Sequence, residues 1–151
     1  KPTCSSDYSS LDHNFLLLLI KSWGTKDGKV TSWKGTGENI FLLRNGKLLT
    51  PPISDNILEG ITRSTIMELA REELGIETIE RSIDRSELYV ADECFLTGTA
   101  AHITPVAELD NRKIGITNPG PISMKLRDMY FDIVIGNNPK YVHWCTSITP
   151  K

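Results

Sequence analysis

The sequence predicts one α/β (α+β) domain in which a mixed sheet is flanked by helices. Three observations support this fold class: a strand hairpin closed by Asn45-Gly46, an amphipathic helix ended by Gly75, and a second amphipathic helix that starts at Pro121. Strands and helices mixed in this order along one chain are typical of a sheet covered by helices. At 151 residues, with 39% hydrophobic and 24% charged side chains, the chain is long enough to bury its own core.

The first part of the chain carries the weakest local signals. Residues 11–20 are an apolar run that fits a buried helix or a strand, because periodicity does not separate the two in a short run. Its most apolar part, residues 15–20, is too short to cross a bilayer, and the acidic, polar segment before it is a poor secretory signal. Residues 26–29 are predicted to form a turn that leads into a short strand through Val30 and Trp33.

The next unit is a hairpin followed by a helix. Asn39–Arg44 and Lys47–Thr50 are apolar-rich strands joined by Asn45-Gly46, the strongest short hairpin signal. In the helix that follows, Arg63 and the other charged residues fall away from the apolar face, and Gly75 stands where a left-handed C-cap is expected. The residues predicted to share the apolar face are Ile66, Leu69, Ala70 and Leu74.

Shorter elements are predicted after this helix. Residues 76–83 should return as a strand, residues 85–91 should form a short helical turn, and residues 93–97 should be a buried strand. Residues 102–107 are a further strand, in which Pro105 predicts an edge or a bulge.

A turn and a long helix complete the chain. Residues 110–113 are predicted to be the turn, and Pro121 is a favourable first residue for the helix, which Gly136 should close. The apolar side chains that recur with helical spacing are Ile122, Leu126, Met129, Tyr130 and Ile133.

The best candidate binding site lies in residues 58–63, where a loop turns into the first helix. Gly60 lets the backbone approach a ligand closely, and the amides of the first helical turn have no partner inside the helix. Together with the helix dipole, these amides favour a phosphate or carboxylate. The loop at residues 97–101 is built of small residues and has the same character. We therefore predict that a phosphate-bearing cofactor lies between a first corner (residues 60–62) and a second corner (residues 98–100).

Composition excludes several other function classes. A net charge of −2 gives no electrostatic reason to expect a nucleic acid or a membrane as partner. The three cysteines are widely spaced and include no CxxC pair, which favours free thiols in a reducing compartment, and the histidines lack the spacing of a metal site. We therefore expect no metal and a cytoplasmic location. Because the chain starts at Lys1 rather than at a methionine, we expect it to be the tail of a longer product.

Several segments, in their order and spacing, resemble branched-chain amino-acid aminotransferases. The matching segments are Gly35-Thr36-Gly37-Glu38-Asn39-Ile40-Phe41, Ile57-Leu58-Glu59-Gly60-Ile61-Thr62-Arg63, Gly98-Thr99-Ala100-Ala101, and residues 49–52, 87–89, 91–93, 103–106, 120–122, 130–133 and 144. The resemblance extends over roughly three quarters of the chain, far more than one short motif. It implies the D-amino-acid-aminotransferase-like fold of class IV pyridoxal-phosphate enzymes, and specifically its larger C-terminal domain with a mixed sheet or barrel and flanking helices.

The resemblance also implies roles for individual residues. In the family, the phosphate of pyridoxal 5′-phosphate lies on the helix start that Gly60, Ile61 and Thr62 match, and on the threonine that Thr99 matches. Ala100 and Gly98 would lie near the substrate carboxylate. The implied reaction passes an amino group from leucine, isoleucine or valine to 2-oxoglutarate.

The chain departs from the family pattern before Gly35. Family members usually carry a glutamate there to hold the pyridine nitrogen of the cofactor as a cation, whereas this chain has Lys34, whose charge disfavours that cation. The lysine that links to the cofactor normally lies roughly thirty-odd residues earlier, which makes Lys1 a candidate by position only. Tyr8 is a loose match for the tyrosine that touches the ring oxygen.

These departures leave several functions open. The chain is expected to be an incomplete branched-chain transaminase, a non-catalytic remnant that keeps phosphate or cofactor affinity, or a relative with D-amino-acid aminotransferase or aminodeoxychorismate lyase activity. We expect residues 1–34 to be a divergent N-terminal segment of the same domain, which a frameshift, a fusion or a decayed gene would explain. Residues 35–151 are expected to be the C-terminal class IV domain, with the small N-terminal domain absent. The expected partners are a small amino acid, a 2-oxo acid and further copies of the chain.

Overall fold

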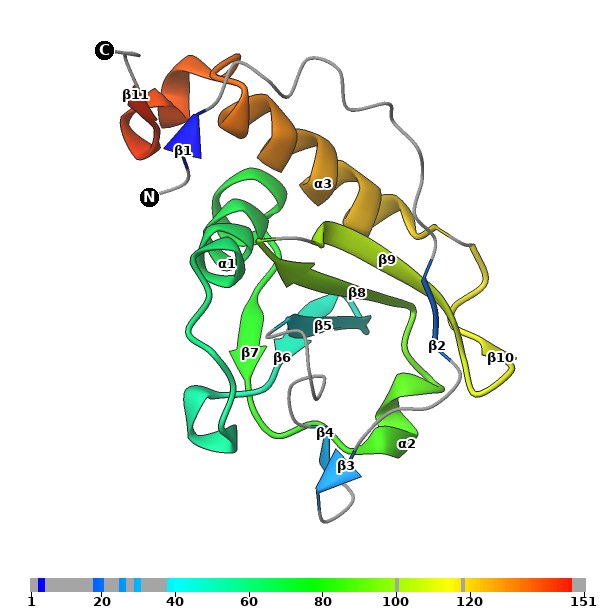
Figure 1. Cartoon of the computed structure of the whole chain (residues 1–151). Helices are drawn as coiled ribbons and strands as arrows, with labels where there is room; N and C mark the ends of the chain where they lie inside the picture. Colours follow the sequence, from blue (N-terminus) through cyan, green and yellow to red (C-terminus); the bar gives the residue numbers. More distant parts are fainter. Residues whose placement is uncertain are drawn as a thin grey trace.

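The computed structural model describes residues 38–99, 101–117 and 119–147, together with short strand segments before them (Figure 1). The strands are β1 (Thr3–Cys4), β2 (Leu18–Ile20), β3 (Thr25–Lys26), β4 (Lys29–Val30), β5 (Asn39–Arg44), β6 (Lys47–Thr50), β7 (Thr78–Glu80), β8 (Glu93–Gly98), β9 (His102–Leu109), β10 (Arg112–Lys113) and β11 (Thr146–Ser147). The helices are α1 (Ile61–Leu74), α2 (Arg85–Leu88) and α3 (Pro121–Val134), with the 3₁₀ turns η2 (Ile53–Asp55) and η3 (Pro139–Trp144).

Within the described residues, a seven-stranded mixed sheet forms the centre of the molecule. Its order is β10-β9-β8-β5-β6-β7, and β2 pairs with β9 off this path. The β6-β7 and β2-β9 pairs are parallel, whereas the pairs along β10-β9-β8-β5-β6 are antiparallel. The predicted mixed sheet with flanking helices is therefore confirmed.

The hairpin predicted from Asn45-Gly46 is confirmed. In the β5-β6 ladder Leu42 pairs with Leu49 and Arg44 pairs with Lys47, so the two turn residues lie between the paired ends. Asn45 and Gly46 have φ values of 51° and 73°, the left-handed conformation that this tight turn requires. The earlier turn at residues 26–29 also joins paired strands, because Lys26 pairs with Lys29; Trp33 lies outside the described residues.

Strand alternation divides the core into two layers. Phe41 of β5 and Phe95 of β8 stack with ring centroids 5.2 Å apart on the face covered by α1 and α3, where Leu69 and Leu126 complete the packing (Figure 1). The opposite face of the same strands packs against the segment that contains α2. The main buried residues of that second layer are Ile40, Leu42, Ile83, Leu88, Leu96 and Ile114.

The ends of both long helices agree with the sequence. Gly75 follows α1 with φ 63°, and its amide donates to the carbonyl of Ala70, which gives the predicted left-handed C-cap. Pro121 opens α3, and Gly136 lies just beyond its end with φ 80°. The short helix α2 falls inside the predicted helical turn, and β8 reproduces the predicted buried strand.

Four expectations need correction or refinement. The strand expected over residues 76–83 is only Thr78–Glu80, a short edge strand that pairs with β6 alone among the described strands. The turn expected over residues 110–113 is narrower, because Arg112–Lys113 form β10 and return along β9. Pro105 was expected to place its strand at an edge or a bulge, but β9 lies between β8 and β10; the pairing of β9 with β2 begins at Val106 and shifts register there, directly after Pro105. Of the apolar run at residues 11–20, the described part is the strand β2.

For Arg63, the expectation was wrong. Only 3% of Arg63 is exposed, although it was expected to lie away from the buried face of α1. Its guanidinium donates to the carbonyl of Pro51 at 3.0 Å and to the Glu80 carboxylate at 2.7 Å. A buried arginine needs such partners, and α1 therefore binds the end of β6 and the edge strand β7 through a polar link.

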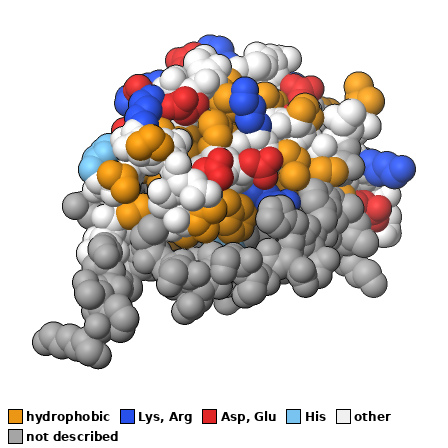
Figure 2. Space-filling model, turned by 90° about the horizontal axis from the view of Figure 1, so that it is seen from above, with side chains coloured by type: hydrophobic (Ala, Val, Ile, Leu, Met, Phe, Trp, Pro, Cys, Tyr) orange, Lys and Arg blue, Asp and Glu red, His pale blue; other side chains and the backbone are white. Residues whose placement is uncertain are grey.

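On the face seen in Figure 2, the described side chains form no large region of one charge. Basic, acidic and apolar side chains are interspersed there (Figure 2). In the described part of the chain, no helix combines the length and the apolar character needed to span a membrane.

Candidate functional site

The first turn of α1 has no cap from the side chain of its own N-cap residue. Gly60 is its N-cap residue, no side chain caps the helix, and no acidic residue lies in its first turn. The first amide that bonds within the helix is that of Ser64, which donates to the carbonyl of Gly60 at 3.1 Å. The amides of Ile61 and Thr62 therefore have no intrahelical acceptor, and they lie at the positive end of the helix dipole.

Asn39 holds the loop that enters this helix. It is only 2% exposed, and its Nδ2 atom donates to the carbonyl of Leu58 at 2.8 Å. A Cβ atom built on Gly60 would lie 2.5 Å from Asn39 Oδ1, closer than any side chain permits. Because Gly60 has ordinary φ and ψ values of −76° and 136°, glycine is needed here for space and not for a left-handed conformation.

The second corner lies on the other side of the same strand end. Asn39 pairs with Thr97, and Gly98 packs against Glu38, whose Cγ would lie 3.1 Å from a Cβ atom on Gly98. Gly60 therefore contacts Asn39, and Gly98 contacts the residue directly before it. The structure thus brings Gly60 and Gly98, one residue from each predicted corner, close to the start of β5, and the Thr99 side chain is exposed.

Thr62 can offer its amide more readily than its side chain. The Thr62 side chain is buried, and its Oγ1 lies 3.5 Å from the hydroxyl of Tyr130 on α3. The Thr62 hydroxyl therefore points into the interface between α1 and α3. The Ile61 side chain, in contrast, is 58% exposed, so the first turn of α1 is accessible to a ligand.

Helix α3 provides an internal comparison. Its N-cap, Gly120, likewise has no side-chain cap from its own residue. Here the buried carboxylate of Glu93 accepts hydrogen bonds from the amides of Ile122 at 3.0 Å and Ser123 at 2.7 Å, and from the Ser123 hydroxyl at 2.7 Å. The chain thus supplies an anion to the start of α3, whereas no carboxylate of the described residues is bonded to the start of α1.

His102 closes the turn after the second corner. It pairs with Gly98 and adopts φ 50°, a left-handed conformation that is uncommon for a residue with a side chain. Its ring centroid lies 5.5 Å from that of Phe131 on α3. Partial burial lowers the pKa of His102 below its ordinary value, so its neutral form prevails at pH 7 and adds no positive charge to the corner.

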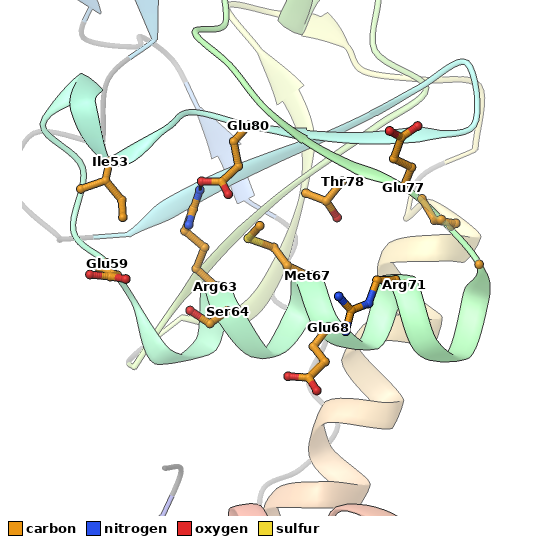
Figure 3. Close-up of a pocket in the computed structure, with 12 residues that line it drawn as sticks. Ile53, Glu59, Arg63, Ser64, Met67, Glu68, Arg71, Glu77, Thr78 and Glu80 are labelled. Carbon is orange, nitrogen blue, oxygen red and sulfur yellow. Dashed lines mark hydrogen bonds and ion pairs between the residues drawn. The ribbon is translucent and has the colours of Figure 1, made fainter.

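A separate groove of about 640 Å³ lies between α1 and β7 (Figure 3). Its charged lining is mostly acidic, and its Arg63 is already paired with Glu80, so it is a poor place for a phosphate. It includes neither Ile61 and Thr62 nor Gly98 and Thr99, and is thus distinct from the predicted site. The lining residues are Ile53, Glu59, Arg63, Ser64, Met67, Glu68, Arg71, Gly75, Ile76, Glu77, Thr78 and Glu80.

Four residues singled out by the sequence lie outside the described residues: Lys1, Tyr8, Lys34 and Ala100. Their roles stay predictions. Among the residues that the structure describes, no three His, Cys, Asp or Glu side chains gather as a possible metal site.

Two functional features were missed by sequence reasoning. Asn39 was expected to be only a polar residue at the entry of a strand, and nothing local shows that it holds a loop 19 residues away. Glu93 likewise gives no local sign that it caps a helix 29 residues later. The sequence does show that neither helix has a capping side chain at its N-cap, because Gly60 and Gly120 stand there. Each helix start therefore needs a hydrogen-bond acceptor from another part of the chain or from a ligand.

Comparison with known proteins identifies the family. A family model described as Amino-transferase class IV matches residues 24–109, more than half of the chain. The chain belongs to the class IV aminotransferases. This confirms the predicted family.

Relatives of this class IV aminotransferase chain are named as branched-chain-amino-acid aminotransferases. A probable branched-chain-amino-acid aminotransferase of Aquifex aeolicus is 52% identical over 118 residues, which are 78% of this chain and 38% of that protein. The branched-chain-amino-acid aminotransferase of Escherichia coli K12 is 40% identical over 115 residues, 76% of this chain and 37% of that protein. This chain therefore spans less than two fifths of the length of these relatives.

Solved structures confirm the predicted fold. The branched-chain amino acid aminotransferase of Thermobaculum terrenum in its PLP-form (holo-form) superposes with a TM-score of 0.74 at 48% identity. The match covers 80% of this chain and 38% of that one. The mixed sheet and helices described above are thus those of a class IV aminotransferase.

Proposed function

We propose that this chain forms the phosphate-binding part of a pyridoxal-phosphate-dependent branched-chain amino-acid transaminase. The observation that carries the proposal is the uncapped start of α1, held by Asn39 next to the second corner. The names of the relatives and the cofactor-bound form of the Thermobaculum enzyme support the choice of cofactor and substrate class.

The residues present fit a phosphate ester. The amides of Ile61 and Thr62 would donate to two phosphate oxygens, and Gly60 keeps the approach free of a side chain. The exposed hydroxyl of Thr99 would donate from the second corner. A doubly charged anion between the two corners would complete α1 as Glu93 completes α3, and no described carboxylate occupies the first turn of α1 to compete with it.

The remaining residues would serve the substrate. When bound, the cofactor supplies an electron-withdrawing ring that stabilises negative charge at the substrate α-carbon. Gly98 and Ala100 would orient the substrate carboxylate with their backbone amides, since neither residue carries more than a methyl group that could block its approach. Tyr8 would contact the ring oxygen, and the amino group of Lys1 is the positional candidate to move a proton at the α-carbon.

A non-catalytic binding domain is the second candidate, and Lys34 favours it. A lysine in place of the glutamate before Gly35 would withdraw support from a protonated pyridine nitrogen, and the ring would then stabilise less negative charge. Such a chain would keep its phosphate affinity because neither corner involves Lys34. Measurements of cofactor binding and of transaminase activity on the same chain therefore separate the two candidates.

A spectroscopic titration of the purified chain with pyridoxal 5′-phosphate tests the proposal. We expect saturable binding that is at least tenfold tighter than that of pyridoxal, which lacks the phosphate. Equal affinity for the two compounds would reject the phosphate site. Transamination assayed with leucine, isoleucine and valine, and with D-amino acids and aminodeoxychorismate as the alternative substrates, then identifies the activity; binding without turnover would establish the non-catalytic candidate.

Assembly and location complete the proposal. Leu58 and Ile61 are 64% and 58% exposed at the entry of the site, an apolar surface that supports association with further copies or with the remainder of the family fold. Light scattering that shows only monomers would reject self-association. Cys94 is a buried free thiol, which supports a reducing, cytoplasmic location.

A further inference from the structure

The hydroxyl of Thr97 is a polar group without a hydrogen-bond partner among the described residues. Thr97 is completely buried, and its Oγ1 atom has no acceptor or donor within reach there. Nearly all buried hydroxyls in native proteins are bonded, and one left unbonded destabilises the fold. Such a group therefore needs an explanation.

Its position places this hydroxyl beside the start of α1. Thr97 pairs with Asn39 in the β5-β8 ladder, and directly opposed residues project from the same face of a sheet. Two residues further along, Phe41 and Phe95 lie on this face and pack in the cluster that contains the α1 side chains. Thr97 is thus level with Asn39, the residue that touches Gly60 at the N-cap of α1.

The exposure of successive residues increases from Thr97 to Thr99. Thr97 is buried, Gly98 is partly exposed and Thr99 is exposed. The Thr97 hydroxyl therefore lies one layer beneath the edge at which the two corners meet, and faces the helix start rather than the solvent.

We propose that Thr97 is an additional binding residue, whose hydroxyl donates a hydrogen bond to the phosphate group held by the first turn of α1. This inference rests on the proposed function, since it assigns a further contact at the same site. The hydroxyl is the only polar atom of the Thr97 side chain, and phosphate oxygens accept hydrogen bonds from neutral donors as well as from amides. Ligand binding would then satisfy a group that the free chain leaves unbonded.

The replacement Thr97→Val tests this because it removes the hydroxyl and conserves the shape. A hydroxyl with no partner in the free chain costs stability, so its removal should leave the melting temperature unchanged or raise it. The same change should weaken the binding of pyridoxal 5′-phosphate and of inorganic phosphate by about fivefold, the effect of one hydrogen bond. Thr97→Ser, which keeps the hydroxyl, should restore the affinity.

Thr78→Val is the matched control. Thr78 Oγ1 is also buried without a partner among the described residues, but it lies on β7 in the separate groove. Its removal should act on stability in the same direction and leave ligand affinity unchanged. Thr50→Val is the opposite control, because Thr50 Oγ1 donates to the carbonyl of Ile40 at 2.8 Å; this variant should lose stability and keep its affinity.

The outcomes separate this inference from the proposed function. If the unmodified chain binds neither pyridoxal 5′-phosphate nor inorganic phosphate, the proposed function itself fails. If it binds them and Thr97→Val binds them equally well, the function stands and the role of Thr97 is rejected. A fall in stability with unchanged affinity would likewise reject it, since that pattern indicates a buried water or another internal partner.

Discussion

Asn39 and Gly60 form a contact that leaves no room for a side chain on the glycine. The Oδ1 atom of Asn39 lies 2.5 Å from the position that a Cβ atom on Gly60 would take, while its Nδ2 atom is bonded to the carbonyl of Leu58. Asn39 thus fixes both the path of the loop and the place at which α1 begins. The direction of the free amides at this helix start follows from that contact.

Gly60→Ala should therefore destabilise the protein. The new methyl group forces Asn39 to move and breaks its bond to Leu58, which should lower the free energy of unfolding by about 1–3 kcal/mol. Urea denaturation measures this loss. In Asn39→Ala/Gly60→Ala the clash is absent, so the double variant should lose less than the sum of the two single changes; additive losses would contradict the contact.

Glu93→Gln tests the internal anion at α3. The carboxylate accepts three hydrogen bonds from Ile122 and Ser123, and a glutamine would turn its NH₂ group toward at least one of these donors. Because Glu93 is only 6% exposed, the unfolding free energy should fall by about 2–4 kcal/mol in urea denaturation. The exposed Glu72→Gln, as control, should change it by less than about 0.5 kcal/mol. An equally small effect at Glu93 would show that the cap contributes little.

Glu87 predicts a loss of stability in acid. Its hydrogen bonds to the Arg81 guanidinium lower the pKa of the Glu87 carboxyl from 4.5 to about 2. A lowered native pKa means that the unfolded chain takes up the proton first, so this contribution is complete above pH 4.5 and disappears as the pH falls to about 2. Because Arg81 is partly exposed, we expect about 1–2 kcal/mol rather than the full shift.

Urea denaturation of Glu87→Gln between pH 6 and pH 2.5 measures the contribution of Glu87 to the free energy of unfolding. The variant should be less stable than the unmodified chain at pH 6 and should approach it toward pH 2.5. A constant difference over this range would contradict the prediction, because it would mean that ionisation of Glu87 does not contribute.

His102 should also make the protein less stable in acid, but here the cause is burial and not an ion pair. Burial lowers the pKa of His102 below 6.5, so the unfolded chain binds a proton before the native chain does. Stability should fall as the pH drops below 6.5. His102→Asn removes the titrating group and suits the left-handed φ of 50°, so it should reduce the fall in melting temperature between pH 7.5 and pH 5.5. The exposed His143→Asn should leave most of that fall in place.

Much of the fold could be predicted because its signals are local. Asn45-Gly46 takes a left-handed turn, Gly75 takes a left-handed cap, and Pro121 starts a helix, each for reasons contained in a few neighbouring residues. The open start of α1 was predictable in the same way, since Gly60 brings no capping side chain.

The sequence by itself thus determined the family, the strong turns and helices, and the helix start without a capping side chain at Gly60. Only the tertiary structure decided that Glu93 caps α3, that Arg63 is buried against Glu80, and that the Thr97 hydroxyl lies level with Asn39 without a partner among the described residues. The reason is physical: these relationships join residues far apart in the chain, and strand pairing and helix packing fix which of them meet. Short-range propensity and spacing carry no information on that choice.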